Sequence, residues 1–323
     1  MKILVTGGTG FIGQHLLRFL LQKAENEIYA LVRQPQKMEP ALASALSVLR
    51  GDLFNLPSLP PDLDLVFHLA GLTKAARSTA YYKVNHLGTA SLLKALESQR
   101  KKIRFIYLSS QAAAGPARDS IPVKETDPPS PLNPYGRSKL MGEKAALSYA
   151  RRFHVIILRV GAVYGPGDRD FLAFFSFIRR GLLPLFDSGR MRFNLCYVTD
   201  LVRALDLAAR SELPSGEIFN IGDARSYSWE EIGRTAALVL EKKIIKIKIP
   251  LPVVFGVAAL SHFLSWISGR ASVINLDKYK EMKASFWLAD MSKARQGLGF
   301  QPQYDLKTGL KETLEWYLRE GWL

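Results

Sequence analysis

A glycine-rich turn near the N-terminus constrains the fold of this chain most strongly. Residues 5–13 read Val-Thr-Gly-Gly-Thr-Gly-Phe-Ile-Gly, after an apolar run at residues 2–5 and before apolar residues at helical spacing over 11–21. A glycine turn between a buried strand and a helix is typical of dinucleotide sites, because the free N–H groups at the helix N-terminus bind phosphates. The residues expected to bind the cofactor here are Gly7, Thr9, Gly10, Phe11, Ile12 and Gly13.

A cation follows the second predicted strand. Residues 26–32 read as this strand, Arg33 stands at its end, and Lys37 lies nearby. Sites that prefer NAD usually carry an Asp or Glu here to hold the ribose hydroxyls, whereas a guanidinium fork matches a 2′-phosphate. We therefore predict that NADP(H) is favoured over NAD(H), with Arg33 and Lys37 as cofactor-binding residues. The alternative is that Arg33 is a solvated surface residue.

Composition and charge narrow the classes of partner. The chain has 323 residues, 48% of them hydrophobic, and a single cysteine, Cys196, which excludes an internal disulfide and fits a reducing compartment. The first predicted strand leaves no room for a signal peptide, so a cytoplasmic protein is expected. The net charge of +15 is spread over scattered pairs without interleaved aromatic residues, which argues against nucleic-acid binding. No metal site is expected.

Apolar strands and amphipathic helices alternate through the first half of the chain. Further strands are expected at 46–49, 63–69, 103–108 and 155–158, and helices at 80–96 and 135–152. Continuous apolar strands between helices indicate a parallel sheet covered on both faces, which is the doubly wound α/β or Rossmann fold. Residues 1–165 would form the dinucleotide-binding domain. Residues 166–323 would mostly form a smaller C-terminal substrate-binding region, with some segments returning to the core and a strand with one polar side at 243–249.

An uncharged apolar stretch at residues 251–267 stands apart from the rest of the sequence. It contains Pro252 and Gly256, and we predict that it forms a buried helix pair covering a substrate site. One alternative is a peripheral contact with a membrane surface, supported by neighbouring Lys and Arg residues. The other is a membrane span, for which the stretch is a little short because a span needs roughly 20 residues.

Residues 135–139 read Tyr-Gly-Arg-Ser-Lys and carry the predicted chemistry. Tyr135 and Lys139 would share one face of a helix, and Ser110 would lie at the carboxyl end of the fifth strand, where ligands bind in such sheets. A phenol titrates at about 10, and a neighbouring ammonium lowers that pKa. We therefore predict hydride transfer at a substrate carbon, with Ser110 orienting the substrate oxygen and Tyr135 giving or taking the proton.

Taken together, these motifs resemble those of the extended short-chain dehydrogenases/reductases of the NAD-dependent epimerase/dehydratase superfamily, over nearly the whole chain. The segments that carry the resemblance are Thr-Gly-Gly-Thr-Gly-Phe-Ile-Gly at 6–13, Gly-Asp-Leu at 51–53, His-Leu-Ala-Gly at 68–71, Val-Asn at 84–85, Leu-Ser-Ser at 108–110, Tyr-x-x-x-Lys at 135–139 and Leu-Arg-Val-Gly-Ala-Val-Tyr-Gly-Pro at 158–166.

The resemblance implies further cofactor contacts. From the adenine end to the nicotinamide end, they are Asp52 and Leu53, then Leu69, Ala70 and Gly71, then Asn85, Val160 and Val163. Asn85 would act by stabilising the active-site helix or a water relay. The family usually has Pro where Val160 stands, so that loop is expected to be set slightly differently.

Two segments bear on the branch of the family. Nucleotide-sugar dehydratases place Asp and Glu directly after the active-site position, whereas this chain has Gln-Ala-Ala-Ala at 111–114, which disfavours sugar dehydration. Epimerases commonly carry an Arg for the sugar-nucleotide phosphates where Phe193 stands, with Arg190 and Arg192 close by. The segments that resemble the 3β-hydroxysteroid dehydrogenase and dihydroflavonol reductase branch are 192–200, 286–294 and 298–300.

The sequence therefore predicts an NADP(H)-dependent oxidoreductase that acts on an alcohol or ketone of an apolar, lipid- or steroid-like substrate. The alternative is a nucleotide-sugar 4-epimerase or 4-reductase, and a third interpretation is a non-catalytic cofactor sensor. Asp200 is expected to cap a helix that begins at Leu201. The helices at 80–96 and 135–152 form the dimer bundle of many relatives, so a homodimer is expected.

Overall fold

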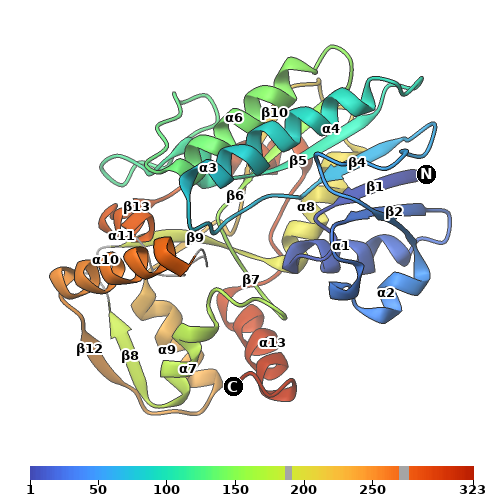
Figure 1. The fold of residues 1–323 in the computed structure, drawn as a ribbon. Helices are drawn as coiled ribbons and strands as arrows, with labels where there is room; N and C mark the ends of the chain where they lie inside the picture. Colours follow the sequence, from blue (N-terminus) through green and yellow to red (C-terminus); the bar gives the residue numbers. More distant parts are fainter. Residues whose placement is uncertain (186–190, 269–275) are drawn as a thin grey trace.

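A seven-stranded parallel sheet forms the centre of the molecule (Figure 1). The computed structural model describes residues 1–185, 191–268 and 276–323. The strand order is β10-β6-β5-β4-β1-β2-β3, so the chain progresses outward in both directions from β1 and β4. These strands are β1 (Lys2–Thr6), β2 (Glu27–Val32), β3 (Ser47–Arg50), β4 (Leu65–His68), β5 (Arg104–Ser110), β6 (His154–Val160) and β10 (Glu217–Ile221). The predicted doubly wound sheet is confirmed, and its ligand crevice is expected at the carboxyl ends of β1 and β4.

Helices cover both faces of the sheet (Figure 1). Ile106 and Leu108 of β5 pack on one face in a core shared with the helices α1 (Phe11–Leu21), α8 (Val198–Arg210) and α12 (Ser292–Leu298). Phe105 and Tyr107 point to the opposite face, which is covered by α4 (Thr89–Leu96) and α6 (Pro134–Ser148). The period of two along β5 thus divides its side chains between two cores. The core that contains Ile106 and Leu108 also includes α8 and β10, although both come from the second half of the chain.

The helix predicted over residues 80–96 is present, but its middle is a π-helix. It consists of α3 (Ser78–Tyr81), the π-helical segment η2 (Tyr82–Gly88) and α4. The amide of Asn85 in η2 bonds both backbone groups of Leu72, with Nδ2 to O at 3.0 Å and N to Oδ1 at 2.7 Å. A π-helical turn is frequent at functional sites, and here it turns an amide toward the loop that follows β4.

The C-terminal half adds a smaller region beside the carboxyl edge of the sheet (Figure 1). Its core is shared by α7 (Leu172–Arg179), β8 (Leu182–Leu185), β9 (Arg192–Tyr197), α9 (Trp229–Val239) and α13 (Leu306–Arg319). β9 pairs with β7 (Ala162–Tyr164), β11 (Ser226–Tyr227) and β13 (Phe286–Trp287), and β8 pairs with β12 (Ile245–Lys248). The remaining short elements are η1 (Pro35–Lys37), α2 (Pro40–Ala45), α5 (Gln111–Ala114) and α11 (Leu276–Lys283). The strand expected within 243–249 is β12, but all four of its residues are exposed.

The prediction of a buried helix pair at 251–267 is wrong. One continuous helix, α10 (Leu251–Ser268), runs through Pro252 and Gly256, and much of its apolar surface is exposed. Proline is tolerated in the first turn of a helix, so Pro252 does not break it. Within the described ranges, α10 included, no helix has the length and apolarity that a membrane crossing requires.

The expected capping role of Asp200 is also wrong. The helix α8 begins at Val198, so Asp200 lies within its first turn rather than before it. Its carboxylate accepts the backbone N–H groups of Gln303 and Tyr304 at 3.0 and 3.1 Å and pairs with Arg203 at 3.0 Å. Asp200 therefore fastens the segment before α13 to α8.

Candidate active site

The glycine turn connects β1 to α1 in a conformation that larger residues could not adopt. Gly7 has φ +78°, and a Cβ there would lie 2.7 Å from the backbone nitrogen of Ala70. A Cβ on Gly13 would lie 2.2 Å from the carbonyl oxygen of Gly7, so Gly13 lets α1 pack directly on the turn. Gly10 precedes α1, whose free N–H groups open toward the turn. This cradle fits the pyrophosphate of a dinucleotide.

A cavity of about 1470 Å³ extends from the glycine turn along the carboxyl edge of the sheet. The sequence-predicted residues that line it are Gly7, Thr9, Gly10, Phe11, Ile12, Gly13, Lys37, Leu69, Gly71, Ser110, Tyr135, Lys139, Val160 and Val163. The structure therefore brings the glycine turn and the three predicted catalytic residues to one cavity. Five predicted residues do not line it, namely Arg33, Asp52, Leu53, Ala70 and Asn85.

Arg33 and Asp52 lie outside the cavity at the ends of neighbouring strands. Arg33 is exposed directly after β2. The Asp52 carboxylate accepts the N–H groups of Phe54 and Asn55, both at 2.8 Å, and these bonds with the nearby charge of Arg33 lower its pKa. Leu53 is buried against Gly88 of η2. Asp52 and Leu53 thus shape a turn beside the end of β2.

Ala70 and Asn85 support the loop that lines the cavity without lining it themselves. The N–H of Ala70 donates to Thr6 Oγ1 at 3.2 Å. The Nδ2 group of Asn85 donates to Ser138 Oγ at 2.9 Å, in addition to its bond with Leu72. Asn85 is fully buried. Its side chain therefore ties the loop after β4 to α6, the helix that carries Tyr135 and Lys139.

The three predicted catalytic residues come from β5 and α6. Ser110 ends β5, and its Oγ accepts the N–H of Ala112 at 3.2 Å. Tyr135 lies in the first turn of α6, which begins because Asn133 Oδ1 accepts the N–H of Gly136 at 2.8 Å. Lys139 follows one turn later, and its Nζ donates to the carbonyl oxygen of Leu108 at 2.6 Å.

Burial controls the protonation of Tyr135 and Lys139. It raises the pKa of Tyr135 to about 12, although a hydrogen bond with Ser110 acts in the opposite direction. It lowers the pKa of Lys139 to about 7. Desolvation therefore dominates the pKa of Tyr135, and the lowering expected from Lys139 and an oxidised nicotinamide stays a prediction for the enzyme with its cofactor bound. The Lys139 Nζ donates to Leu108 and lies 4.3 Å from the centre of the Tyr107 ring.

A buried ion pair stands behind the catalytic helix, and the sequence analysis missed it. Glu143 of α6 accepts two hydrogen bonds from Arg159 of β6, at 2.9 and 2.7 Å, and a third from Ser109 Oγ at 2.5 Å. Both charged side chains are nearly inaccessible. The pair joins α6 to β5 and β6. Glu143 lies one helical turn after Lys139, and this spacing is the sequence signal that could have indicated a buried carboxylate.

Aromatic side chains form part of the cavity wall. Four of the chain's five tryptophans line it, namely Trp229, Trp287, Trp316 and Trp322. Phe193 lines it too and packs against Trp229 with ring centres 5.1 Å apart. Arg169 also lines the cavity, over the ring of Trp322 at 4.8 Å. Buried Gln111 contributes an amide Nε2 for which the described residues supply no hydrogen-bond partner.

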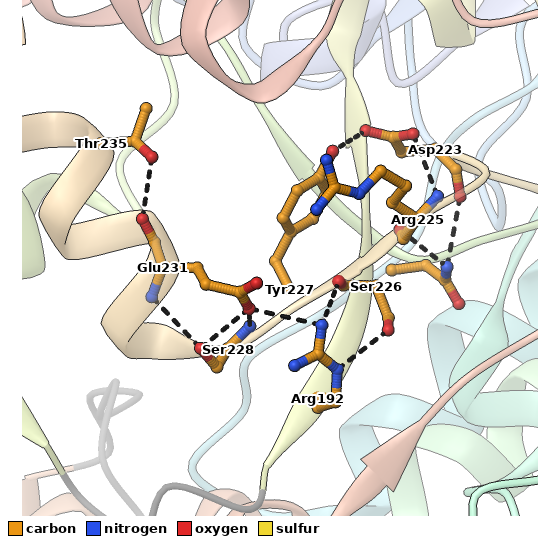
Figure 2. A network of polar contacts seen from close by, with 9 residues as sticks. Arg192, Asp223, Arg225, Ser226, Tyr227, Ser228, Glu231 and Thr235 are labelled. Atoms are coloured by element: carbon orange, nitrogen blue, oxygen red, sulfur yellow. Dashed lines mark hydrogen bonds and ion pairs between the residues drawn. The ribbon is translucent and has the colours of Figure 1, made fainter.

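Arg192 belongs to a polar network (Figure 2) and is not among the residues that line the cavity. It donates to Ser226 Oγ at 3.2 Å and to Ser226 O at 2.8 Å, and pairs with Glu231 at 3.4 Å. Glu231 also accepts the N–H and hydroxyl of Ser228, so it is shared between the start of α9 and Arg192. Arg192 thus holds β9 to β11 and α9, while Arg190 lies outside the described residues.

Comparison with known proteins agrees with the resemblance that the motifs indicate. Residues 3–222 match the model of the NAD dependent epimerase/dehydratase family. The chain is 31% identical to a ceramide reductase of Caulobacter vibrioides, over 99% of this chain and 96% of that protein. It is 26% identical to a UDP-glucose 4-epimerase of Vibrio cholerae, over 98% of this chain and 96% of that protein.

The fold matches solved structures over its full length. The crystal structure of a UDP-glucuronic acid 4-epimerase from Bacillus cereus in complex with NAD has a TM-score of 0.79 and 26% identity, covering 100% of both chains. With the family match over residues 3–222, the agreement covers both fold and sequence. The chain is therefore an enzyme of the extended short-chain dehydrogenases/reductases and belongs to the NAD-dependent epimerase/dehydratase family.

Proposed function

We propose that this enzyme interconverts a secondary alcohol and a ketone, with a nicotinamide dinucleotide held by the turn at residues 7–13 and with Ser110, Tyr135 and Lys139 as its acid–base residues. The observation that carries the proposal is the single cavity that joins this turn to the three side chains. When bound, the cofactor would supply or accept the hydride.

The three side chains would divide the proton chemistry between them. Ser110 would donate a hydrogen bond to the substrate oxygen. Tyr135 would give its phenolic proton to that oxygen during reduction and take it back during oxidation, and its raised pKa keeps it protonated at neutral pH. Lys139, held by the carbonyl of Leu108, would place a positive charge near the phenolate that forms when Tyr135 gives up its proton.

The first candidate reaction is 4-epimerisation of a nucleotide sugar. The relatives named as UDP-glucose and UDP-glucuronic acid 4-epimerases support this alternative better than the apolar-substrate prediction. For the oxidative half of that reaction Tyr135 must be the phenolate, so its pKa must fall below the value of about 12 that burial sets. It would then remove the proton of the sugar hydroxyl and return it after the opposite face of the sugar has been presented. Arg169, which lines the cavity, would be the cation that meets the diphosphate.

The second candidate is reduction of a long-chain ketone. A specific observation favours it: Phe193 lies in the cavity wall, while the neighbouring Arg192 is occupied by Ser226 and Glu231. The four tryptophans would bury an apolar chain, and the relative named as a ceramide reductase agrees with such a substrate class. In this case Gln111 would contact the polar head of the substrate.

Cofactor retention and product formation would separate these candidates. The purified protein would be denatured and the released nucleotide assayed. The enzyme would then be incubated with UDP-glucose or UDP-glucuronate, and separately with a long-chain 3-ketone and reduced cofactor. Retained NAD with epimerised sugar supports the first candidate, and an empty protein that reduces the ketone supports the second. The Tyr135→Phe variant is the control, and a wild-type protein that converts no alcohol or ketone would overturn the proposal.

Relatives support NAD(H) as the cofactor, because the Bacillus cereus structure is described with NAD. The NADP(H) preference is a separate proposal, attached to the second candidate, and it rests on exposed Arg33 and on Lys37 at the cavity. An Arg33→Ala/Lys37→Ala variant should weaken NADPH binding by about tenfold and leave NADH binding nearly unchanged, since only the 2′-phosphate needs these cations. Calorimetric titration with both cofactors measures this, and equal wild-type affinities would refute it.

A further inference from the structure

Helix α10 exposes a long apolar stripe. Val253, Val257, Leu260, Leu264 and Ile267 are between 50 and 62% exposed. Their alternating spacing of four and three residues places them along one side of the helix. Val254, Ala258 and Ser265 are buried and face the protein. A contiguous exposed apolar surface of this kind marks an interaction site.

The chain on both sides of α10 is strongly basic. Residues 242–283 contain eight Lys or Arg and two Asp or Glu, and none of these ten lies between residues 251 and 268. The described cations that are exposed here are Lys242, Lys243, Lys246, Lys248, Lys280 and Lys283. The two acids, Asp277 and Glu281, line the active-site cavity. Of the six cations, Lys246 pairs with Glu230 and Lys280 with Asp277.

Strand β12 exposes two further apolar side chains among these lysines. Ile245 and Ile247 of β12 are 71 and 41% exposed, and they alternate with Lys246 and Lys248. Figure 1 shows β12 and α10 as consecutive elements on the same end of the molecule. That end of the molecule therefore exposes both apolar side chains and ammonium groups.

We propose that α10 and β12 form a docking surface for an anionic lipid bilayer. The stripe would enter the boundary between headgroups and acyl chains, with α10 lying along the bilayer, and the lysines would meet the lipid phosphates. The charge selects this occupant over a second copy of the chain. Two copies would bring their basic rims together, whereas an anionic bilayer is complementary to both the charge and the apolar stripe.

This docking would place the active site close to the bilayer. The ring of Phe255 in α10 packs against Tyr279 of α11 with centres 5.3 Å apart. The same short helix α11 carries Asp277 and Glu281, which line the cavity. Helix α11 therefore both contacts α10 and lines the cavity. The inference goes beyond the proposed function and does not depend on it.

Vesicle binding by the full chain tests this inference. The protein would be sedimented with vesicles of phosphatidylcholine alone and of phosphatidylcholine with phosphatidylglycerol. We expect binding only to the anionic vesicles, weakened by salt that shortens the Debye length. A Leu260→Ser/Leu264→Ser variant should lower the partition coefficient at least about tenfold, because binding strength follows buried apolar area. The matched control, Ile121→Ser/Leu318→Ser, removes exposed apolar side chains elsewhere and should bind as the wild type does.

A charge variant keeps the test independent of the apolar substitutions. Lys248→Glu/Lys283→Glu changes two exposed lysines and should also reduce binding to anionic vesicles. Circular dichroism would verify that each variant is folded. The inference is overturned if the wild type ignores anionic vesicles, or if both variants bind like the wild type. It is also overturned if the serine substitutions only convert a dimer to a monomer in sedimentation velocity without changing vesicle binding.

Discussion

Gln111 occupies a decisive position at the scale of single residues. It follows Ser110 directly, is 5% exposed and lines the cavity. A buried amide that lacks a partner costs free energy unless a ligand satisfies it. From the sequence, Gln111 showed only that the carboxylate of the sugar dehydratases is absent at this position. The sequence gives no signal of the direction in which a helical glutamine points its amide.

Replacing Gln111 should therefore weaken substrate recognition. A Gln111→Leu variant keeps a similar volume but removes the amide, and kcat/KM should fall by roughly tenfold, the equivalent of one hydrogen bond to the substrate. The free energy of unfolding should stay the same or rise, since an unpaired buried polar group is removed. Steady-state kinetics and urea unfolding measure both quantities. Unchanged kcat/KM would show that the amide does not contact the substrate.

Lys139 should make stability depend on pH in a defined direction. Its pKa falls from 10.5 to about 7 on folding, so between these values the unfolded chain binds more protons and stability rises with pH. The Lys139→Met variant lacks this contribution. The wild type should gain up to about 1.4 kcal/mol per pH unit over the variant between pH 7 and 9, below the range in which Tyr135 titrates. Urea unfolding at several pH values measures the difference, and parallel profiles would contradict the prediction.

At the scale of elements, helix α6 carries Tyr135 and Lys139, and Asn133 caps the N-terminus of this helix. Besides capping the helix, Asn133 donates from Nδ2 to Glu281 Oε1 of α11 at 2.7 Å. One side chain therefore joins the catalytic helix to the C-terminal region, beside the cavity that both elements line.

Loss of this cap should destabilise the protein and its site together. An Asn133→Ala variant should lower the free energy of unfolding by about 1–2 kcal/mol. Asn133→Asp keeps an acceptor for the N–H of Gly136 but sets a carboxylate against Glu281, so it should also be destabilising. Adding Glu281→Gln should recover much of that loss, because an amide can donate to the new carboxylate. Thermal and urea unfolding of the three proteins test this, and an Asn133→Ala variant as stable as the wild type would refute the capping role.

Elements with strong periodicity were predictable from sequence, and those decided by tertiary contacts were not. The glycine turn, the parallel strands and α6 follow from apolar runs, glycine spacing and helical spacing. The π-helical turn in η2 depends on bonds between Asn85 and Leu72, which are 13 residues apart in sequence. The exposure of α10 could not be deduced, because an apolar helix has the same pattern whether another element covers it or not. The position of Asp200 within α8 likewise depends on the distant Gln303 and Tyr304.

At the scale of the whole molecule, a homodimer through residues 80–96 and 135–152 remains a prediction. Leu87 and Met141 on these helices are 52 and 37% exposed, which supports an apolar contact between copies. We expect sedimentation velocity at micromolar concentration to give the dimer mass. A Leu87→Lys/Met141→Lys variant should give the monomer, because like charges would then meet across the interface. A wild-type protein of monomer mass would contradict the prediction.

Both halves of the molecule line the cavity, with the glycine turn and four tryptophans in its walls. A nicotinamide dinucleotide should bind there, and energy transfer from tryptophan to reduced dinucleotide measures this binding directly. Titration should quench the tryptophan emission and saturate at one dinucleotide per chain, counting any dinucleotide that the protein releases on denaturation. Excess oxidised dinucleotide should reverse the quenching. A protein that releases no nucleotide on denaturation and shows no transfer with either NADH or NADPH would contradict this binding.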